Sequence, residues 1–334
     1  MMATIGWLVG SLLMVLYAAH LFTNGVEWLG KRLGYSHGMI GSVLAGVGTA
    51  LPETAIPIIA ILFRGGEQHF QEVGIGAILG APFMLTALTL PLLGLAVWGL
   101  GRARRREPRF RLTPPLIQFD LTYFLIGYSL AIGIAFVPVA PLRYAVALFL
   151  VGLYGHYLWR LRQLDRLHAA DDELLPPLIL SPRAERPLLG MILAQVFLGL
   201  AGIIGGAHFF VDAVNEIATA NHLSPLLLSL WITPVATELP EKVNSLIWVF
   251  QRKDSLAVAN ITGAMVFQAT FPVSVGLLGT PWLLTGHGLT TGIGALIAAA
   301  AYVALLRRQQ TWHPWQLMLG GLLYIGFGLS LALF

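Results

Sequence analysis

Hydrophobic residues in this chain are gathered into long runs, and polar residues occupy the short segments between them. A helix that spans a bilayer needs about 20 predominantly apolar residues, and this pattern predicts an all-α integral membrane protein with ten transmembrane helices. The third and eighth runs are rich in Gly, Pro and Thr, so we expect these helices to be tilted or kinked. The expected helices are centred near Met14, Leu51, Thr86, Gly127, Val151, Leu200, Leu239, Val266, Ile297 and Leu323.

One of these apolar runs, residues 229–254, is interrupted by charged residues. It reads SLWITPVATELPEKVNSLIWVFQRKD, with Glu238, Glu241 and Lys242 around Pro240. A charged side chain at the bilayer centre costs about 2.5–3.5 kcal/mol on insertion scales, so such residues mark functional sites by default. Pro240 also removes one helical hydrogen bond and frees a backbone carbonyl. Carbonyl and carboxylate oxygens suit Ca²⁺, Mg²⁺, Na⁺ or protons.

The same arrangement occurs earlier in the chain. Residues 49–53 read TALPE, where residues 237–241 read TELPE. The histidines His20 and His208 precede the final glutamates of the two motifs by the same 33 residues. This equal spacing indicates an internal duplication. Two proline-broken helices at matching positions in two halves are the best sequence indication of a transporter's binding site.

The composition fits a membrane protein and argues against several other classes. Hydrophobic residues make up 57% of the 334 residues and charged residues 11%, whereas ordinary globular proteins have about 25% charged residues. The basic residues lie in short loops, so the net charge of +4 does not indicate nucleic-acid binding. With no cysteine, no nucleotide-binding loop and no zinc-type spacing, we expect no disulfide and no cofactor. The first run, near residues 5–29, lacks a basic leader and is expected to remain as a span.

The distribution of Lys and Arg predicts the orientation of the spans. If the N-terminus lies outside, 17 of the 20 basic residues fall in loops on the cytoplasmic side. They are Lys31, Arg32, Arg102, Arg104, Arg105, Arg106, Arg109, Arg111, Arg160, Arg162, Arg166, Arg183, Arg186, Arg252, Lys253, Arg307 and Arg308. Only Arg64 and Arg143 fall in outside loops, while Lys242 lies within a span. We therefore expect a multi-pass protein of the plasma (inner) membrane with both termini outside.

Five spans precede the longest loop and five follow it. We expect a first five-helix repeat over residues 1–161, a cytoplasmic connecting loop over residues 162–186 and a second five-helix repeat over residues 187–334. Because each repeat has an odd number of spans, the two repeats cross the membrane in opposite senses. Inverted repeats of this kind are typical of transporters that expose a midplane site alternately to the two sides of the membrane.

Residues 48–53, GTALPE, resemble the first α-repeat of the sodium/calcium exchanger superfamily, whose motif is close to G-T-S-x-P-E. Residues 236–241, ATELPE, are similar to the second α-repeat, and residues 76–83 and 260–268 look like the G-S-N-containing segments that follow. The two α-repeats are expected over about residues 38–100 and 224–280. The resemblance covers essentially the whole chain. It implies a secondary active antiporter that moves Ca²⁺ in exchange for H⁺ or Na⁺, without a cofactor and without enzymatic activity.

The cation ligands of the family carry over where the residues match. Glu53 and Glu241 occupy the two glutamate positions of the motif, so the resemblance implies that they are the metal ligands. Thr49 and Thr237 occupy the threonine positions, whose hydroxyl and carbonyl groups line ion sites in the family. The resemblance therefore implies a site shared by both halves of the chain.

The chain departs from the family pattern at several positions. Glu238 replaces a motif serine and adds a carboxylate, and Gln268 stands where the family has Asn or Asp. We expect both side chains to line the site, although Glu238 could instead pair with Lys242 one helical turn later and Gln268 could form a hydrogen bond between helices. We expect Lys242, which follows the second glutamate, to act as an internal counter-charge. The remaining departures remove side-chain oxygens and are Ala50, Ala81, Leu85 and Ala264. They weaken the case for Na⁺ as the coupling ion, and the segment around Gln268 resembles the cation/proton exchanger branch.

The charges of this cluster bear on the coupling ion. When ionised, the carboxylates of Glu53, Glu238 and Glu241 sum with Lys242 to −2, which one Ca²⁺ neutralises. When Ca²⁺ leaves, the bare charge is unfavourable in low-dielectric surroundings. Two protons restore neutrality without further ligands, whereas two Na⁺ ions would each need several oxygen atoms. We therefore expect coupling to H⁺ at least as readily as to Na⁺, with near-electroneutral exchange.

Two other functions fit part of the pattern. In an intramembrane enzyme, His20 and His208 would hold a metal together with the glutamates, but no H-E-x-x-H spacing is present and the inverted repeat would have no explanation. A passive cation channel would also use buried carboxylates, although paired broken helices favour alternating access. The expected partners are the lipid bilayer and inorganic cations, with no nucleic acid. The sequence does not predict the oligomeric state.

Overall fold

The structure, a computed structural model, describes residues 2–33, 51–64, 67–103, 107–112, 114–165, 175–308 and 311–333. Most residues in these ranges are helical, and within them one two-stranded antiparallel ribbon pairs β1 (Phe110–Arg111) with β2 (Thr311–Trp312). Helices suit an apolar chain because each helix satisfies its own backbone hydrogen bonds without water. The all-α fold class predicted from the sequence is confirmed.

The helices follow the hydrophobic runs of the sequence. In the first half they are α1 (Met2–Arg32), α4 (Leu51–Ile58), α5 (Gln68–Met84), α6 (Leu90–Arg102), α7 (Pro114–Ile134) and α8 (Ala140–Asp165), with π-helical segments η2 (Ile59–Phe63) and η3 (Leu85–Thr89). In the second half they are α9 (Leu189–Ala220), α10 (Pro225–Thr237), α11 (Leu239–Phe250), α12 (Asp254–Gln268), α13 (Phe271–Gly279), α14 (Gly286–Arg308), α15 (Pro314–Met318) and α16 (Gly320–Leu333). Each predicted span centre falls within one of these elements.

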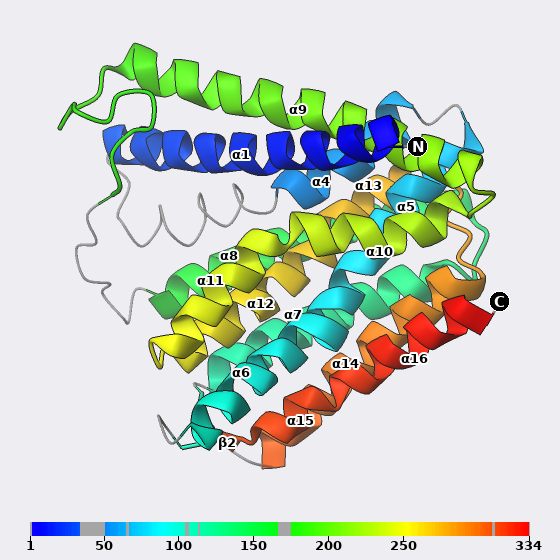
Figure 1. Ribbon diagram of the computed structural model, residues 1–334. Helices are drawn as coiled ribbons and strands as arrows, with labels where there is room; N and C mark the ends of the chain where they lie inside the picture. Colours follow the sequence, from blue (N-terminus) through cyan, green and yellow to red (C-terminus); the bar gives the residue numbers. More distant parts are fainter. Residues whose placement is uncertain are drawn as a thin grey trace.

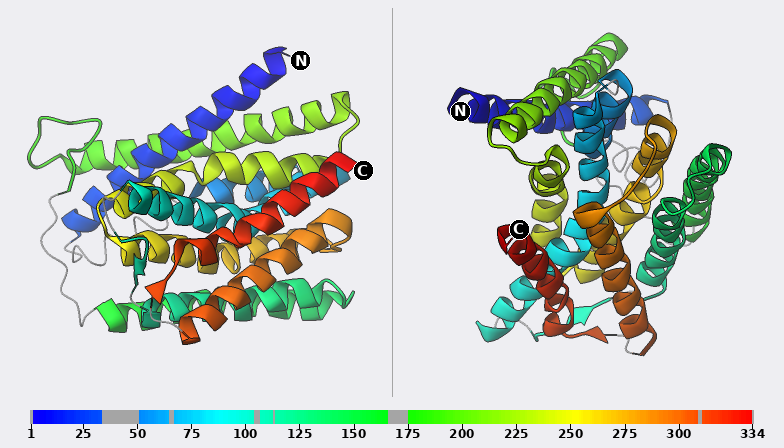
Figure 2. Two further views of the ribbon diagram at one scale, coloured as in Figure 1. Left: turned by 60° about the horizontal axis from the view of Figure 1, so that its bottom comes forward. Right: turned by 90° about the vertical axis from the view of Figure 1, so that its right-hand side faces the viewer.

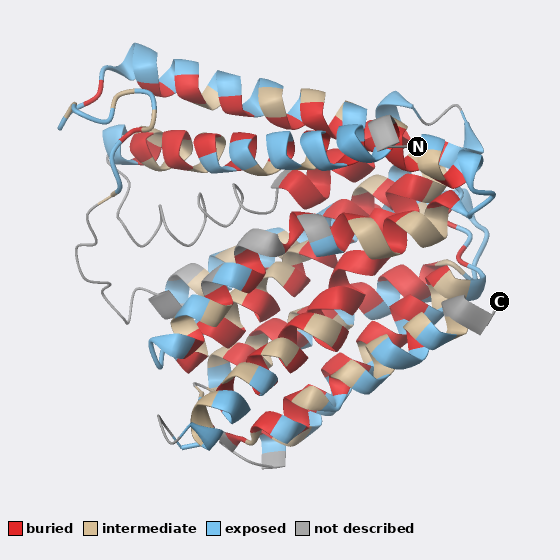
Figure 3. Ribbon diagram, in the orientation of Figure 1, coloured by how far each residue is buried: buried red, intermediate tan, exposed pale blue. Residues whose placement is uncertain are grey.

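Six helical stretches of the described chain are long and apolar enough to cross a membrane, judged by length and composition. They are Thr4–Arg32, Gln68–Arg102, Pro114–Ile134, Leu189–Ala220, Asp254–Gly279 and Gly286–Arg307. Two shorter apolar helices, Pro52–Phe63 and Pro225–Val235, accompany them. Buried residues gather on the faces that the helices turn toward one another (Figure 3), while large apolar side chains such as Trp7, Leu148 and Phe197 are exposed. An apolar outer surface of this kind suits contact with lipid.

Helices α1 and α9 lie side by side as a pair on one side of the molecule (Figures 1 and 2). Small residues allow them to approach each other closely: a Cβ added to Gly199 would lie 2.7 Å from the backbone nitrogen of Phe22. Small residues at such contacts are typical of helix packing in membranes. The chain that leads into α9 is also held against this pair, because the indole Nε1 of Trp28 donates to the carbonyl of Pro176 at 2.9 Å.

Helix α5 crosses α10 inside the bundle, and this crossing brings the two halves of the chain together. A Cβ added to Gly76 would lie 2.6 Å from the carbonyl oxygen of Leu226, and one added to Gly80 would lie 2.5 Å from that of Leu230. Real Cβ atoms do not approach a backbone oxygen so closely, so the crossing requires glycine at both positions. It also positions the end of α10 beside the end of α5.

Several of the predicted spans are interrupted in the described part of the chain. Helix α10 ends at Thr237 and α11 begins at Leu239, with Glu238 between them at φ −87° and ψ 7°. Helix α5 continues into α6 through the π-helical segment η3, and two residues, Ala269 and Thr270, separate α12 from α13. The expected irregularity of the third and eighth spans is therefore present. The break at Glu238 places a non-helical residue beside Lys242, which contacts Met84 of the other half of the chain.

Candidate cation site

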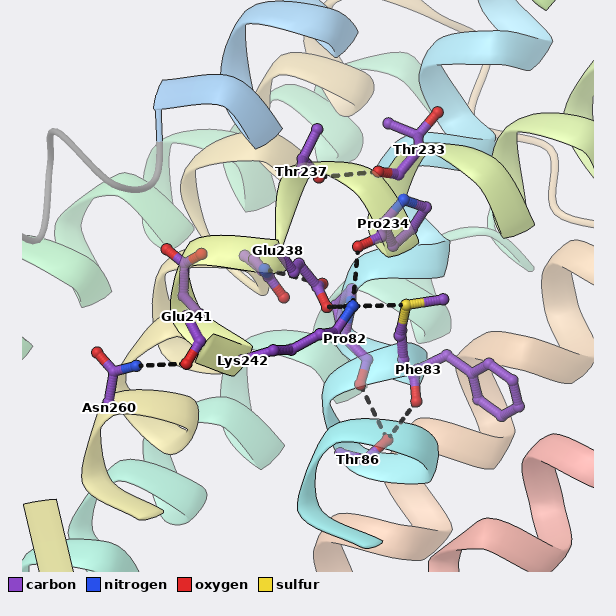
Figure 4. A network of polar contacts seen from close by, with 12 residues as sticks. Pro82, Phe83, Thr86, Thr233, Pro234, Thr237, Glu238, Glu241, Lys242 and Asn260 are labelled. Carbon is purple, nitrogen blue, oxygen red and sulfur yellow. Dashed lines mark hydrogen bonds and ion pairs between the residues drawn. The ribbon is translucent and has the colours of Figure 1, made fainter. Parts of the chain in front are cut away.

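The break between α10 and α11 holds a buried ion pair (Figure 4). Glu238 has no exposed surface and Lys242 is 7% exposed. The Nζ of Lys242 lies 3.3 Å from Oε2 of Glu238, one helical turn away. It also donates to the carbonyl oxygen of Pro234 at 3.1 Å and to Sδ of Met84 at 3.0 Å. Lys242 therefore points into the bundle, toward the end of α5, and not toward lipid.

Gln268 reaches this ion pair from the end of α12. Its Nε2 donates to Oε1 of Glu238 at 3.4 Å, and its own Oε1 is buried without a hydrogen-bond partner in the described part of the chain. Thr237 is 1% exposed, and its Oγ1 donates to the carbonyl of Thr233 at 3.0 Å. A hydroxyl oxygen has two acceptor lone pairs, so this bond does not prevent Thr237 from coordinating a cation.

Glu241 lies in the first turn of α11 and is 5% exposed. The amide of Asn260 on α12 donates to the backbone carbonyl of Glu241 at 3.4 Å and to Oγ of Ser245 at 3.1 Å. These two bonds fix α11 against α12. They hold the helix that carries Glu241 next to the helix that carries Gln268.

Glu53 enters the same region from the other half of the chain, on α4. It is 6% exposed, and neither of its carboxylate oxygens has a hydrogen-bond partner among the described residues. It lies near enough to Glu241, Glu238 and Lys242 for their charges to act on its carboxylate. An ionised carboxylate is unfavourable in such surroundings unless it is paired or coordinates a cation. The structure thus brings three carboxylates and one ammonium group from both halves into one buried region.

The two histidines do not join this region. His20 is exposed on α1, and the half-buried His208 packs edge-on against Phe63 with ring centres 6.2 Å apart. In the described ranges, no three His, Cys, Asp or Glu side chains converge closely enough to hold a metal ion by themselves. The structure gives no support to a metal enzyme built on these histidines. Glu53, Glu238 and Glu241 are therefore not close enough to one another to hold a metal ion without further ligands.

The other positions named from the sequence either lie outside the described residues or have no side-chain oxygen. Thr49 and Ala50 lie outside the described residues. Ala81 and Leu85 are buried on α5 and η3, and Ala264 is half-buried on α12. As expected from their chemistry, these alanine and leucine side chains bring no oxygen to the region.

Sequence reasoning missed two residues with defined roles in the packing. Met84 supplies the sulfur that Lys242 contacts. Asp120 on α7 is 2% exposed and accepts hydrogen bonds from the hydroxyl of Tyr157 on α8 at 3.1 Å and from Oγ1 of Thr262 on α12 at 2.6 Å. The signal that could have identified Asp120 is the one that identified Glu238, an acidic residue within an apolar span.

Comparison with known proteins agrees with the motifs. A family model described as sodium/calcium exchanger protein matches residues 3–162 and 191–334. The chain is 26% identical to CaxA of Alkalimonas amylolytica over 313 residues, which cover 92% of this chain and 89% of that protein. The crystal structure of the H⁺/Ca²⁺ exchanger CAX matches with a TM-score of 0.76 at 17% identity, over 98% of this chain and 82% of that chain.

A structure of the sodium-calcium exchanger NCX_Mj matches with a TM-score of 0.58 at 20% identity and covers 96% of both chains. At these identities the two structural matches establish a shared fold. The family model covers both halves of the chain, including both glutamate motifs. The chain therefore belongs to the sodium/calcium exchanger protein family and is a multi-pass membrane antiporter, not an enzyme.

Proposed function

We propose that this antiporter moves Ca²⁺ in exchange for H⁺ or Na⁺, by alternating access around a buried carboxylate site near the membrane midplane. The observation that carries the proposal is that buried carboxylates of both halves lie near one another, Glu53 on α4 and Glu238 and Glu241 at the α10–α11 break. Membership of the exchanger family supports cation antiport in general. The transported ions and the residues of the site are the proposed part.

Glu53 and Glu241 are the proposed metal ligands. Carboxylate, hydroxyl and carbonyl oxygens are the ligands that Ca²⁺ prefers, in groups of six to eight. Thr49 and Thr237 would add hydroxyl or carbonyl oxygens from the two repeats, and Gln268 would add its buried Oε1. The interrupted helix at Glu238 supports this assignment because broken helices present backbone oxygens to ions in transporters.

The ion pair of Glu238 with Lys242 leaves a net charge of −2 for the transported cation to balance. The pair is neutral as a unit, so Glu53 and Glu241 supply the two negative charges when they are ionised. One Ca²⁺ balances them, and two protons can replace it without needing additional ligands. Two Na⁺ ions would each need several oxygen ligands, and Ala81, Leu85 and Ala264 bring no side-chain oxygen to the region. We therefore expect H⁺ to couple at least as readily as Na⁺, with near-electroneutral exchange.

The proposed architecture is ten transmembrane helices in two inverted five-helix repeats, residues 1–161 and 187–334, joined by a cytoplasmic loop over residues 162–186. Two features support it. The first helices of the proposed repeats, α1 and α9, pack against each other, and both termini lie at the same end of the bundle (Figures 1 and 2). The excess of Lys and Arg in the alternate loops supports an orientation with that end outside the plasma membrane.

Gradient-driven Ca²⁺ uptake by proteoliposomes tests this function. One arm applies an outward proton gradient without Na⁺, and the other applies an outward Na⁺ gradient at fixed pH. We expect strong uptake in the first arm and uptake no greater in the second. Strong uptake with Na⁺ and none with protons would refute proton coupling. Uptake that needs neither gradient and follows Ca²⁺ alone would indicate a channel and refute antiport.

A further inference from the structure

We infer that the ammonium group of Lys242 is a built-in cation that occupies a monovalent-cation subsite, and that this residue limits how many ions the site takes up. The inference rests on the proposed function, because it concerns a subsite beside the proposed Ca²⁺ ligands. It identifies Lys242 as a specificity-determining residue and the groups around its Nζ as a latent site for a small monovalent cation such as Na⁺.

The groups around Nζ are those expected around a bound cation. One carboxylate oxygen of Glu238 lies at 3.3 Å, the carbonyl oxygen of Pro234 at 3.1 Å and the thioether sulfur of Met84 at 3.0 Å. An ammonium group has three N–H donors and no acceptor. Three contacts therefore account for its donors, and two of the three are oxygen atoms that would also suit a metal cation.

The position of Lys242 excludes an ordinary surface role. Long basic side chains in membrane helices usually extend toward the interface and keep the charge in water. Lys242 is 7% exposed, and its Nζ contacts Met84, which lies 158 residues away in the other half of the chain. The ammonium group is thus held inside the bundle, at the contact between the two halves.

Both carboxylate oxygens of Glu238 take part in the contacts around Lys242. It has no exposed surface, one of its carboxylate oxygens faces Lys242, and the other accepts from Nε2 of Gln268 at 3.4 Å. Breaking a buried ion pair by removal of one partner leaves an uncompensated charge. If the ammonium group were removed, Glu238 would require a replacement cation. The carbonyl of Pro234, which now contacts Nζ, would then be available as a ligand, and the amide of Gln268, which contacts Glu238, carries a buried Oε1 without a partner among the described residues.

The test substitutes Lys242→Met, which keeps an unbranched side chain, shorter by one atom, and removes its charge. Purified wild-type and variant proteins in detergent are heated in NaCl or in choline chloride at equal ionic strength and constant pH, without Ca²⁺. We expect Na⁺ to raise the Tm of the Lys242→Met variant by a saturable increment, on the order of 2–5 °C, beyond any Na⁺ effect in the wild type. The charge-retaining variant Lys242→Arg should behave as the wild type.

The double variant Glu238→Gln with Lys242→Met identifies the site of this effect. It lacks both charges, so the additional Na⁺ effect should disappear. An unchanged Na⁺ response in Lys242→Met, or a response that persists in the double variant, would overturn the inference. If Lys242→Met does not fold, Lys242→Gln, which keeps a hydrogen-bonding side chain, repeats the measurement. Because no transport is measured, failure of the wild type to move Ca²⁺ would refute the proposed function and leave this result standing.

Discussion

Replacement of Asp120 should destabilise the helix bundle because this buried side chain joins three helices. Asp120 lies on α7 and accepts hydrogen bonds from Tyr157 on α8 and Thr262 on α12. Helix α12 ends at Gln268, beside Glu238. Asp120→Ala removes both acceptors and leaves a cavity, whereas Asp120→Asn keeps the shape and one acceptor oxygen.

The size of the effect follows from the two bonds. Hydrogen bonds to a charged group contribute about 1.5–3 kcal/mol in soluble proteins, but interhelical bonds in membranes average about 0.6 kcal/mol with a maximum near 1.7. The 2.6 Å distance to Thr262 is that of a charge-assisted O–H···O bond. Thr262 can turn to the carbonyl of Ala259 at 3.4 Å, which limits its loss. We expect about 2–4 kcal/mol for Asp120→Ala and about 1–2 kcal/mol for Asp120→Asn.

Thermal unfolding in detergent measures this loss, and roughly 2 °C per kcal/mol predicts a decrease in Tm on the order of 4–8 °C for Asp120→Ala. Tyr123→Phe is the matched control on the same helix, since its hydroxyl bonds the exposed His156 and its loss should be nearly neutral. A double-mutant cycle of Asp120→Asn with Thr262→Val should give a coupling energy of about 1 kcal/mol or more. If Asp120→Ala is as stable as Tyr123→Phe, the assigned role of Asp120 is wrong.

Two further predictions concern the packing and the topology. Gly80→Val places a Cβ 2.5 Å from the carbonyl oxygen of Leu230, so it should lower the free energy of unfolding by about 1–3 kcal/mol and lower the Tm with it. Gly10→Val is the control, because a Cβ at that position meets no atom within 4 Å and should leave the Tm unchanged. Equal Tm values for the two variants would contradict the α5–α10 crossing. The chain has no native cysteine, so single cysteines can report the orientation. A cysteine at Glu185 should react with an impermeant reagent only from the cytoplasmic side, and one at Thr285 only from outside. The reverse pattern would contradict the proposed orientation.

The helices could be predicted because each hydrophobic run is long and bounded by polar residues, so that length and composition decide the element. The helix break was predicted from Pro240, but it lies at Glu238. The physical reason is that proline fits the first turn of a helix, where its missing N–H would have no intrahelical partner. Pro240 therefore lies in the first turn of α11, and the non-helical residue is Glu238, two positions earlier.

The pairing of side chains could be predicted only where the partners lie close in the sequence. The contact of Glu238 with Lys242 follows from their separation of one helical turn. The contact of Lys242 with Met84 and that of Thr262 with Asp120 join residues 158 and 142 positions apart. Such pairs depend on how α5, α7 and α12 pack, which hydrophobic patterns do not specify.

Direct measurement of Ca²⁺ binding tests the central claim that Glu53 and Glu241 hold the transported ion. Purified wild-type protein, the variants Glu53→Gln and Glu241→Gln, and the exposed-site control Glu67→Gln are titrated with Ca²⁺ at constant pH. Our account predicts one Ca²⁺ per chain for the wild type and for Glu67→Gln, and loss of binding in both site variants although they remain folded. Wild-type affinity in Glu53→Gln and Glu241→Gln would contradict it.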